Sequence, residues 1–374
     1  SYCCYPCAVH HAPRGHGPAQ PQYSLFSGST QSMQALFYSK HGSPDVLTYG
    51  GQPDPVLNPA DVLIRVAATG LNRLDIVQRN GWFILPGFQL PHIAGLDFAG
   101  TVVQVGSSVR HVKTGDRVVA DPSMHAIAGD SQYTGFGERY GELGVIGGTH
   151  AGGYGELCAT SADHVHLLPD AIDFTAAAVF ATAWMTTHHA LFRVGQLRSG
   201  ESLLMHGATS ALTLAATQLA IAAGARVFVT AASEEKCEVA RNLGAAATTT
   251  NRETNITDWV MAQTDGRGVD MVLDHVGPAL WEASLFALAP RGRLVTCGNT
   301  TGDSASIPSL GFLFQRGIKI IGSDAYFSTD YANVWQQYCT GIERGHFSPE
   351  IQQTFAIEDG AQAHRLLETG KATG

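Results

Sequence analysis

The sequence predicts an α/β protein that combines a barrel-like β domain with a doubly wound parallel sheet. Residues 33–121 hold many short β-rich segments separated by turn sequences, which is typical of a barrel. Residues 202–323 alternate strand-like and helix-like segments, which is typical of a doubly wound sheet. Residues 202–230 give the clearest signal, because an apolar run, an Ala/Leu-rich stretch and a β-branched run predict one strand–helix–strand unit.

The β-rich part begins at Met33, which looks like a natural start. Residues 1–32 lack periodicity and are rich in Pro, Gly, Ser and His, so we expect a disordered extension. Their three Cys and three His leave a metal-binding tract as the alternative. We then expect, in order, strands within 33–40, 62–70, 91–106, 113–121 and 152–169, turn sequences at 41–46 and 50–61, a short helix or turn at 71–81, and a long loop at 122–150.

The second part follows a strand–helix rhythm in which Gly224, Gly244 and Gly266 each mark the end of a helix. We expect strands at 202–206, 225–230, 268–277, 293–300 and 318–323, and helices at 173–192, 211–223, 233–245, 255–266, 279–292 and 307–317. Two closing helices, at 333–345 and 360–370, flank a short strand-like segment at 351–357.

The composition excludes several classes of protein. The 374 residues are 44% apolar and 15% charged, which is typical of a globular chain large enough for two domains. A net charge of −9 argues against nucleic-acid and anionic-membrane partners, and no apolar run approaches the length of a membrane span. The seven cysteines are odd in number and form no C-x-x-C pair in the globular part, so we expect a cytoplasmic protein without disulfides.

The turn after the strand at 202–206 is where a dinucleotide pyrophosphate would bind, at the N-terminus of the next helix. Such turns are usually rich in glycine because the backbone must approach the phosphates closely. Here Gly207 is followed by other small and polar residues, namely Ala208, Thr209, Ser210, Ala211, Leu212 and Thr213. The sequence therefore predicts a nucleotide site with an altered fingerprint.

Seven segments follow one another in an order known from one enzyme family: LNRLDIVQRNG, LPHIAGLDFAGTVVQVG, VKTGDRVV, GGYGE, GRGVDMVLDHVG, GRLVTCGNTTG and AHRLLETGKATG. Through them the chain resembles the medium-chain dehydrogenase/reductase superfamily, in its zinc-independent quinone oxidoreductase-like branch. The resemblance implies a GroES-like β-barrel domain at 33–165 and 325–374, a Rossmann nucleotide-binding domain at 166–324, and an active cleft between them. It also implies a homodimer, and a short closing strand after Gly374, where this sequence ends.

The family's turn usually reads Gly-Ala-x-Ser-Gly-x-Gly. Gly207, Ala208 and Ser210 match this pattern, whereas Ala211 and Thr213 stand where two glycines would be. A Cβ at Ala211 narrows the path of the pyrophosphate, and Thr213 adds bulk where helix meets strand. We expect the cofactor to bind, with an affinity that these two residues reduce.

The resemblance also bears on metals, because zinc-dependent members carry a catalytic Cys, a His-Glu pair, a second Cys and a lobe with four Cys. The matching positions here are Asn72, Leu96, Asp97 and Ala181, and residues 121–150 contain no Cys. Thiolate and imidazole groups are what hold zinc, so we predict no metal. The isolated His92, His125 and His150 show no ligand spacing.

The cofactor type is indicated at the end of the second strand of the nucleotide unit. An NAD enzyme usually places an acidic residue there, and Ala231 occupies that position. Ser233 and Lys236 match the S-x-x-K of NADP-preferring relatives and would bind a 2′-phosphate. The alternative is that Ser233 only caps the next helix. We expect NADPH ahead of NADH, with a chain that binds neither as the alternative.

Candidate catalytic residues are polar groups at family positions near the nicotinamide: Asn72, Asp75, Tyr154 and His275. Candidate cofactor contacts, besides residues 207–211, Ser233 and Lys236, are Thr182, Val276, Cys297, Gly298 and Asn299. Alternatives stay open: Asp75 would equally cap a helix, and Cys297 would equally fill a core. Arg79 is a further candidate to polarise the acceptor oxygen, and Tyr133 and Tyr140 join Tyr154 as proton donors.

The resemblance implies a zinc-independent NADPH oxidoreductase that passes hydride to a quinone, an enone or a similar conjugated carbonyl of a small molecule. Two alternatives share the same fold. One is a cofactor-impaired member that carries out a cyclisation or an elimination, and the other is a protein that only binds a ligand.

Overall fold

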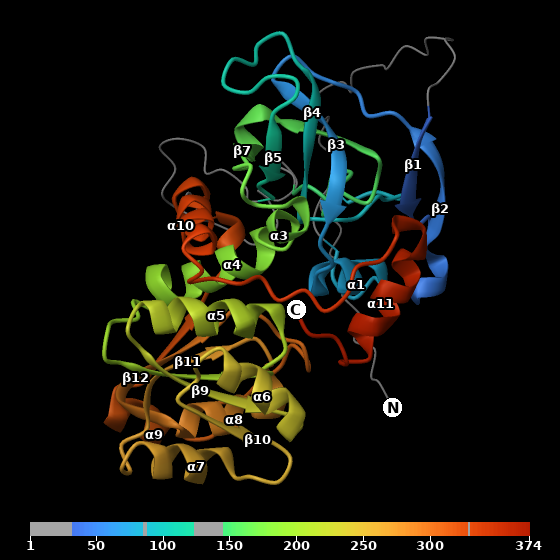
Figure 1. Ribbon diagram of the computed structural model, residues 1–374. Coiled ribbons are helices and arrows are strands. Elements are labelled where there is room, and N and C mark those ends of the chain that lie inside the picture. The colour runs from blue at the N-terminus through green and yellow to red at the C-terminus, as the bar shows by residue number, and fades with distance from the viewer. Residues whose placement is uncertain (1–31, 85–87, 123–144, 328–329) are drawn as a thin grey trace, which may run out of the picture. The chain divides into compact units, whose positions relative to one another are not determined.

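The computed structural model describes residues 32–84, 88–122, 145–327 and 330–374 (Figure 1). Their largest sheet has six parallel strands in the order β10-β9-β8-β11-β12-β13. These strands are β8 (Ser202–His206), β9 (Arg226–Ala231), β10 (Ala247–Thr250), β11 (Val269–Asp274), β12 (Leu288–Thr296) and β13 (Lys319–Gly322). The strand order reverses between β8 and β11, so a ligand is expected outside the carboxyl ends of these two strands.

Helices cover both faces of this sheet, and the alternation of side chains explains how. Leu203 and Met205 of β8 pack on the face covered by α5 (Ala211–Ala222) and α6 (Glu234–Asn242). Leu204 points to the opposite face, where α7 (Ile256–Gln263), α8 (Pro278–Phe286) and α9 (Leu310–Arg316) pack. Every residue of β8 is buried, and between Ser202 and His206 the strand is uniformly apolar. The strand–helix–strand unit predicted at 202–230 is therefore confirmed.

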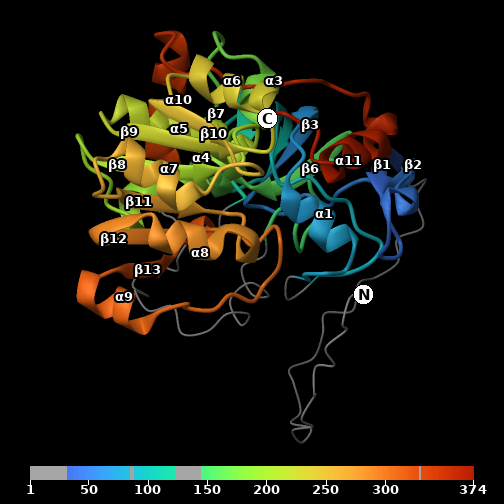
Figure 2. The ribbon, with the colours of Figure 1, turned by 90° about the horizontal axis from the view of Figure 1, so that it is seen from below.

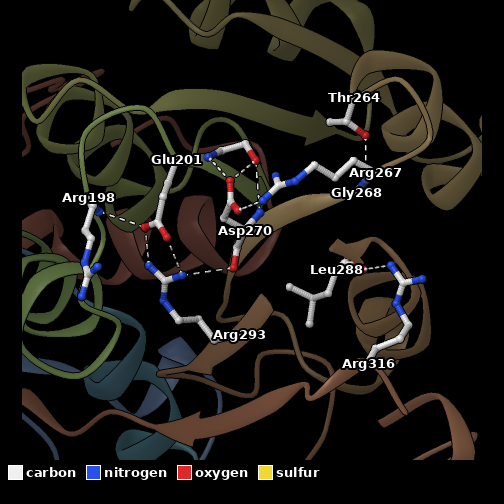
Figure 3. Close-up of polar contacts among 10 residues, drawn as sticks. Arg198, Glu201, Thr264, Arg267, Gly268, Asp270, Leu288, Arg293 and Arg316 are labelled. Carbon is white, nitrogen blue, oxygen red and sulfur yellow. Dashed lines mark hydrogen bonds and ion pairs between the residues drawn. The ribbon is translucent and has the colours of Figure 1, made fainter. Parts of the chain in front are cut away.

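The amino ends of the same strands are closed by charged side chains (Figure 3). Arg293 donates to Glu201 Oε2 (2.6 Å) and to the carbonyl oxygen of Asp270 (3.2 Å). The Asp270 carboxylate accepts from the backbone N–H and the hydroxyl of Ser202, both at 2.9 Å. This cluster ties β8, β11 and β12 together at the edge opposite the expected ligand site.

The β-rich part contains a five-stranded antiparallel sheet with the order β6-β3-β4-β5-β7 and a separate hairpin, β1-β2. The strands are β1 (Ser32–Phe37), β2 (Thr48–Pro53), β3 (Asp61–Thr69), β4 (Phe98–Val105), β5 (Arg117–Ala120), β6 (Leu157–Ser161) and β7 (Val165–Leu167). The helix α11 (Gly360–Glu368) lies beside the hairpin in both ribbon views (Figures 1 and 2). The predicted β domain is confirmed.

Helix α10 (Tyr331–Glu343) joins the two parts of the fold through buried aromatic side chains. The hydroxyl of Tyr331 donates to the carbonyl of Ala120 in β5 (2.7 Å). Phe180 is fully buried against the rings of Tyr331 and Tyr338. None of the described helices combines the length and apolar character needed to cross a bilayer.

Several predicted boundaries were wrong. The helix expected at 173–192 is divided into α3 (Phe174–Ala178), α4 (Ala181–His188) and a π-helical turn (His189–Val194). Helix α8 ends at Phe286 instead of continuing to residue 292, because Leu288 pairs with β11 and Pro290 has no N–H for a helix.

Other differences concern strands. Residues 50–53 were expected to be turn, because they contain two glycines and Pro53, but they belong to β2, which pairs along its whole length with β1. Strand β10 was not predicted, and its run of threonines gives little apolar signal. Residues 351–356 are extended but pair with no strand among the described residues.

Candidate active site

A buried carboxylate organises the start of α4. Asp97 precedes β4, and its two oxygens accept the backbone N–H of Thr182 at 3.1 and 2.9 Å. The Thr182 hydroxyl donates to the same carboxylate at 2.7 Å. Phe180, the residue at the N-cap of α4, makes no side-chain cap, so Asp97 supplies that cap from a distant part of the chain. This contact explains why the helix predicted at 173–192 restarts at residue 181.

A second buried carboxylate, Asp75, caps the short helix α1 (Arg73–Arg79). Its Oδ2 accepts the N–H of Asn72 (2.8 Å) and its Oδ1 accepts the N–H of Gly95 (3.1 Å). Burial raises the pKa of Asp75 to about 7 and that of Asp97 to about 6. The two carboxyl groups therefore titrate near neutral pH, which suits groups that hold or release protons.

Asn72 lies between these two acids. Its side chain is near enough to Asp97 to lower the pKa of that carboxyl. Its Nδ2 is buried and makes no hydrogen bond of standard geometry within the described residues. Tyr326, which follows β13, also reaches this site, since its hydroxyl interacts with Thr182. Tyr326 was not predicted; its position just beyond the carboxyl end of a sheet strand was the available signal.

The expected phosphate-binding turn is present. Gly207 has φ of +74°, which glycine adopts without strain, and its N–H donates to Thr230 O (2.8 Å). Ser210 is the N-cap of α5, but its side chain makes no cap hydrogen bond. The first N–H groups of this twelve-residue helix are thus available to an anion such as a pyrophosphate. The cofactor-binding role assigned to residues 207–211 stays a prediction.

Thr213 lies where helix meets strand, as predicted. Its side chain is fully buried on the strand side of α5, where the hydroxyl donates to His206 O at 2.9 Å. Ala211 is half-buried at the first position of the helix. The expected effect of these two residues on cofactor affinity stays a prediction.

The residues predicted at the ends of β11 and β12 lie together. A Cβ on Gly298 would be 3.2 Å from the Cβ of His275, and one on Gly207 would be 3.6 Å from its ring. Cys297 is tied to β11 through its N–H to Asp274 O (2.9 Å), and burial raises its thiol pKa to about 12. Cys297 is therefore a neutral thiol in this position. Val276 is half-buried beside His275, and Asn299 donates to Asp303 Oδ1 (2.8 Å).

The two predicted 2′-phosphate ligands have partners within the chain. Ser233 caps α6 by accepting the N–H of Lys236 (3.4 Å), as the alternative interpretation expected. Lys236 Nζ donates to the carbonyl of Gly370 at 2.6 Å. The N–H of Gly374 donates to Thr209 O at 3.0 Å. The segment 370–374 therefore contacts both the turn and α6, a proximity that sequence reasoning missed.

Arg79 and Tyr154 belong to a different network. Arg79 is fully buried, donates to Gly42 O (3.0 Å), bonds to His364 Nδ1 (2.7 Å) and forms an ion pair with Glu368. Arg79 is thus not free to polarise an acceptor, and that expectation was wrong. The Tyr154 hydroxyl faces His364 Nε2 at 3.3 Å, and its role as proton donor stays a prediction. Tyr133 and Tyr140 lie outside the described residues.

The donor set does not fit zinc. Asn72 and Asp97 come together beside the start of α4, but they supply a single carboxylate that Thr182 already engages. Within the described residues, no group of three or more His, Cys, Asp or Glu side chains is placed to hold a metal ion. His92 is buried and bonds to Gly147 O (2.9 Å), while His125 lies outside the described residues.

Comparisons with known proteins agree with the fold. The family model for alcohol dehydrogenase GroES-like domains matches residues 58–170, and that for zinc-binding dehydrogenases matches residues 211–339. The quinone oxidoreductase of Pseudomonas aeruginosa is 34% identical over 342 residues, which cover 90% of this chain and 96% of that protein.

A sequence and a solved structure from Escherichia coli show the same similarity to quinone oxidoreductases. Quinone oxidoreductase 1 is 29% identical over 346 residues, which cover 90% of this chain and 96% of that protein. The solved structure of E. coli quinone oxidoreductase complexed with NADPH has a TM-score of 0.75 at 27% identity, covering 91% of this chain and 98% of that one.

Proposed function

The chain belongs to the medium-chain dehydrogenase/reductase superfamily, in its quinone oxidoreductase-like branch, and on that premise we propose that it is an NADPH-dependent oxidoreductase. We further propose that it needs no zinc and reduces a quinone, an enone or a similar conjugated carbonyl. The observation that carries the proposal is the free N-terminus of α5 behind Gly207, at the switch point of the sheet. Thr187 Oγ1 donates to Leu212 O (3.3 Å), which links this turn to α4 and the Asp97–Thr182 pair.

The chemistry divides between cofactor and protein. Bound NADPH would supply the hydride to an electrophilic carbon, and the acceptor would take one proton to complete the reduction. Residues 207–211 and the first turn of α5 would hold the pyrophosphate. The Thr182 hydroxyl, oriented by Asp97, and the Asn72 amide would orient the reacting groups. Asp97 and Asp75, whose pKa values lie near neutrality, are the nearest proton reservoirs.

Titration with NADPH, followed by fluorescence or thermal shift, tests the proposal. We expect saturable binding in the micromolar range, weakened by the Cβ of Ala211, and weaker binding of NADH. Absence of binding at millimolar NADPH would refute the redox proposal and favour a cyclisation, an elimination or ligand binding alone.

Lys236 should govern the choice between the two dinucleotides. We expect Lys236→Ala to raise the Kd for NADPH about fivefold and to leave that for NADH unchanged, because only NADPH carries the 2′-phosphate. The same titration, run with both dinucleotides, measures this. Equal changes for NADPH and NADH would instead assign Lys236 to holding Gly370.

We also propose that two copies associate through the edge strand β13. Ile320 on this strand is 36% exposed, and Leu310 and Phe314 on the adjacent α9 are 68% and 73% exposed. An uncovered edge strand next to apolar side chains favours pairing with another chain. Light scattering should give twice the chain mass, and the chain mass alone would contradict the proposal.

A further inference from the structure

Thr213 stands where the family pattern has its third glycine, and it forms a junction between three elements. Its hydroxyl lies 2.9 Å from His206 O and 3.1 Å from His275 Nε2. His275 Nε2 is itself 3.0 Å from His206 O. Thr213 belongs to α5, His206 ends β8, and His275 directly follows β11.

The chemistry of these groups determines which atom donates in each hydrogen bond. A carbonyl oxygen only accepts, so both the Thr213 hydroxyl and His275 Nε2–H donate to His206 O. Nε2–H is then shared with the Thr213 oxygen, which accepts from it. The arrangement therefore requires the Nε2–H tautomer of His275. Each donor and acceptor has a partner, which makes the junction well defined.

The junction holds both ends of the turn. His206 is the residue immediately before Gly207, and Thr213 is the third residue of α5. The imidazole of His275 packs beneath Gly207, where even an added Cβ would leave ordinary contact distances of 3.6 and 3.9 Å. Thr213 and His275 thus both bond to the residue that opens the turn.

The ring of His206 anchors the junction in the core. Its Nδ1 bonds to Thr230 Oγ1 (2.8 Å), and its Nε2 bonds to Ser284 Oγ (2.9 Å). The Ser284 hydroxyl donates to Leu280 O (2.8 Å), so it accepts from Nε2–H of His206. The carbonyl of His206 is therefore presented from a fully buried and fixed residue.

We propose that Thr213 and His275 are positioning residues that hold the phosphate-binding turn in its cofactor-binding geometry. A glycine at position 213 lets helix and strand pack closely through the absence of a side chain. In this chain the Thr213 hydroxyl and the His275 imidazole would hold helix and strand together through hydrogen bonds to His206 O. The proposal rests on the proposed binding of NADPH.

The test compares Thr213→Val with Thr213→Ser. Valine keeps the shape of threonine but has no hydroxyl, whereas serine keeps the hydroxyl. We expect Thr213→Val to raise the Kd for NADPH about tenfold, and Thr213→Ser to stay within about twofold of the wild type.

Arg293→Ala provides a matched control for stability. It breaks the cluster at the opposite end of the same strands, and we expect it to lower the melting temperature while leaving the Kd for NADPH unchanged. Wild-type binding together with an unchanged Kd in Thr213→Val would overturn the positioning role. So would a loss of affinity in Arg293→Ala equal to that in Thr213→Val. Lack of binding by the wild type would instead refute the proposed function itself.

Discussion

Replacing Arg79 with alanine should lower the free energy of unfolding by about 3–5 kcal/mol, because one side of a buried ion pair is removed. The guanidinium is fully buried and bonds to Gly42 O, His364 and Glu368. Its loss leaves the carbonyl of Gly42 and the imidazole of His364 without these donors and opens a cavity. Urea unfolding measures the difference.

Helix α11, which carries Glu368 and His364, supplies a control for this prediction. Arg365 of α11 forms an ion pair with Asp45, but the two side chains are 51% and 75% exposed. Arg365→Ala should therefore cost less than about 1 kcal/mol. The double variant Arg79→Met, Glu368→Leu should recover part of the loss, since it replaces both charges with apolar groups. Equal losses in Arg79→Ala and Arg365→Ala would contradict the role given to burial.

The parts of the fold that sequence reasoning found are those with local signals. The unit at 202–230 combines a buried apolar strand, a helix without Gly or Pro and a terminal glycine within one short stretch. The predictions that failed did so because the deciding partner lies far away in the chain. The helix expected at 173–192 is divided because the carboxylate of Asp97 caps a new helix at its middle. Strand β2 forms despite its glycines because it pairs with β1.

The candidate site shows the same limit. Asn72, Asp75 and Thr182 were placed through a family resemblance, and the structure brings Asn72 and Thr182 together around Asp97. Asp97 had been considered only as a missing zinc ligand, because its partner Thr182 lies 85 residues further along the chain. Thr213 was predicted to add bulk where helix meets strand, and its side chain lies there, toward His206 and His275. Nothing in the sequence indicated these hydrogen bonds, and the expected loss of cofactor affinity stays a prediction.

Asp97 offers a pH-dependent test of the site. Its pKa is raised to about 6 in the folded protein, so the ionised form that accepts both Thr182 donors is lost as the pH falls through about 6. We expect kcat/KM to decline below that pH in the wild type. For stability the sign is opposite: a raised folded pKa stabilises at low pH, and this contribution is lost as the pH rises through about 6. Asp97→Asn should therefore remove the part of both dependences that centres on pH 6 and leave the part due to Asp75, whose pKa is about 7.

The size of the fall in kcat/KM should distinguish a role of Asp97 in the reaction from a role in stabilising α4. Asp97→Ala removes the carboxylate that accepts from Thr182, so the start of α4 loses its cap and kcat/KM should fall about 100-fold. Asp97→Asn keeps one acceptor oxygen of the same shape, and a fall of only about tenfold is expected. Asp173, which caps α3 by accepting the N–H of Ala176 (2.6 Å), provides the matched control. Asp173→Ala should reduce stability by about 1 kcal/mol and leave kcat/KM unchanged. If Asp173→Ala lowered kcat/KM as much as Asp97→Ala does, Asp97 would be only a helix cap, and the hydroxyl of Thr182 would have no special place in the reaction.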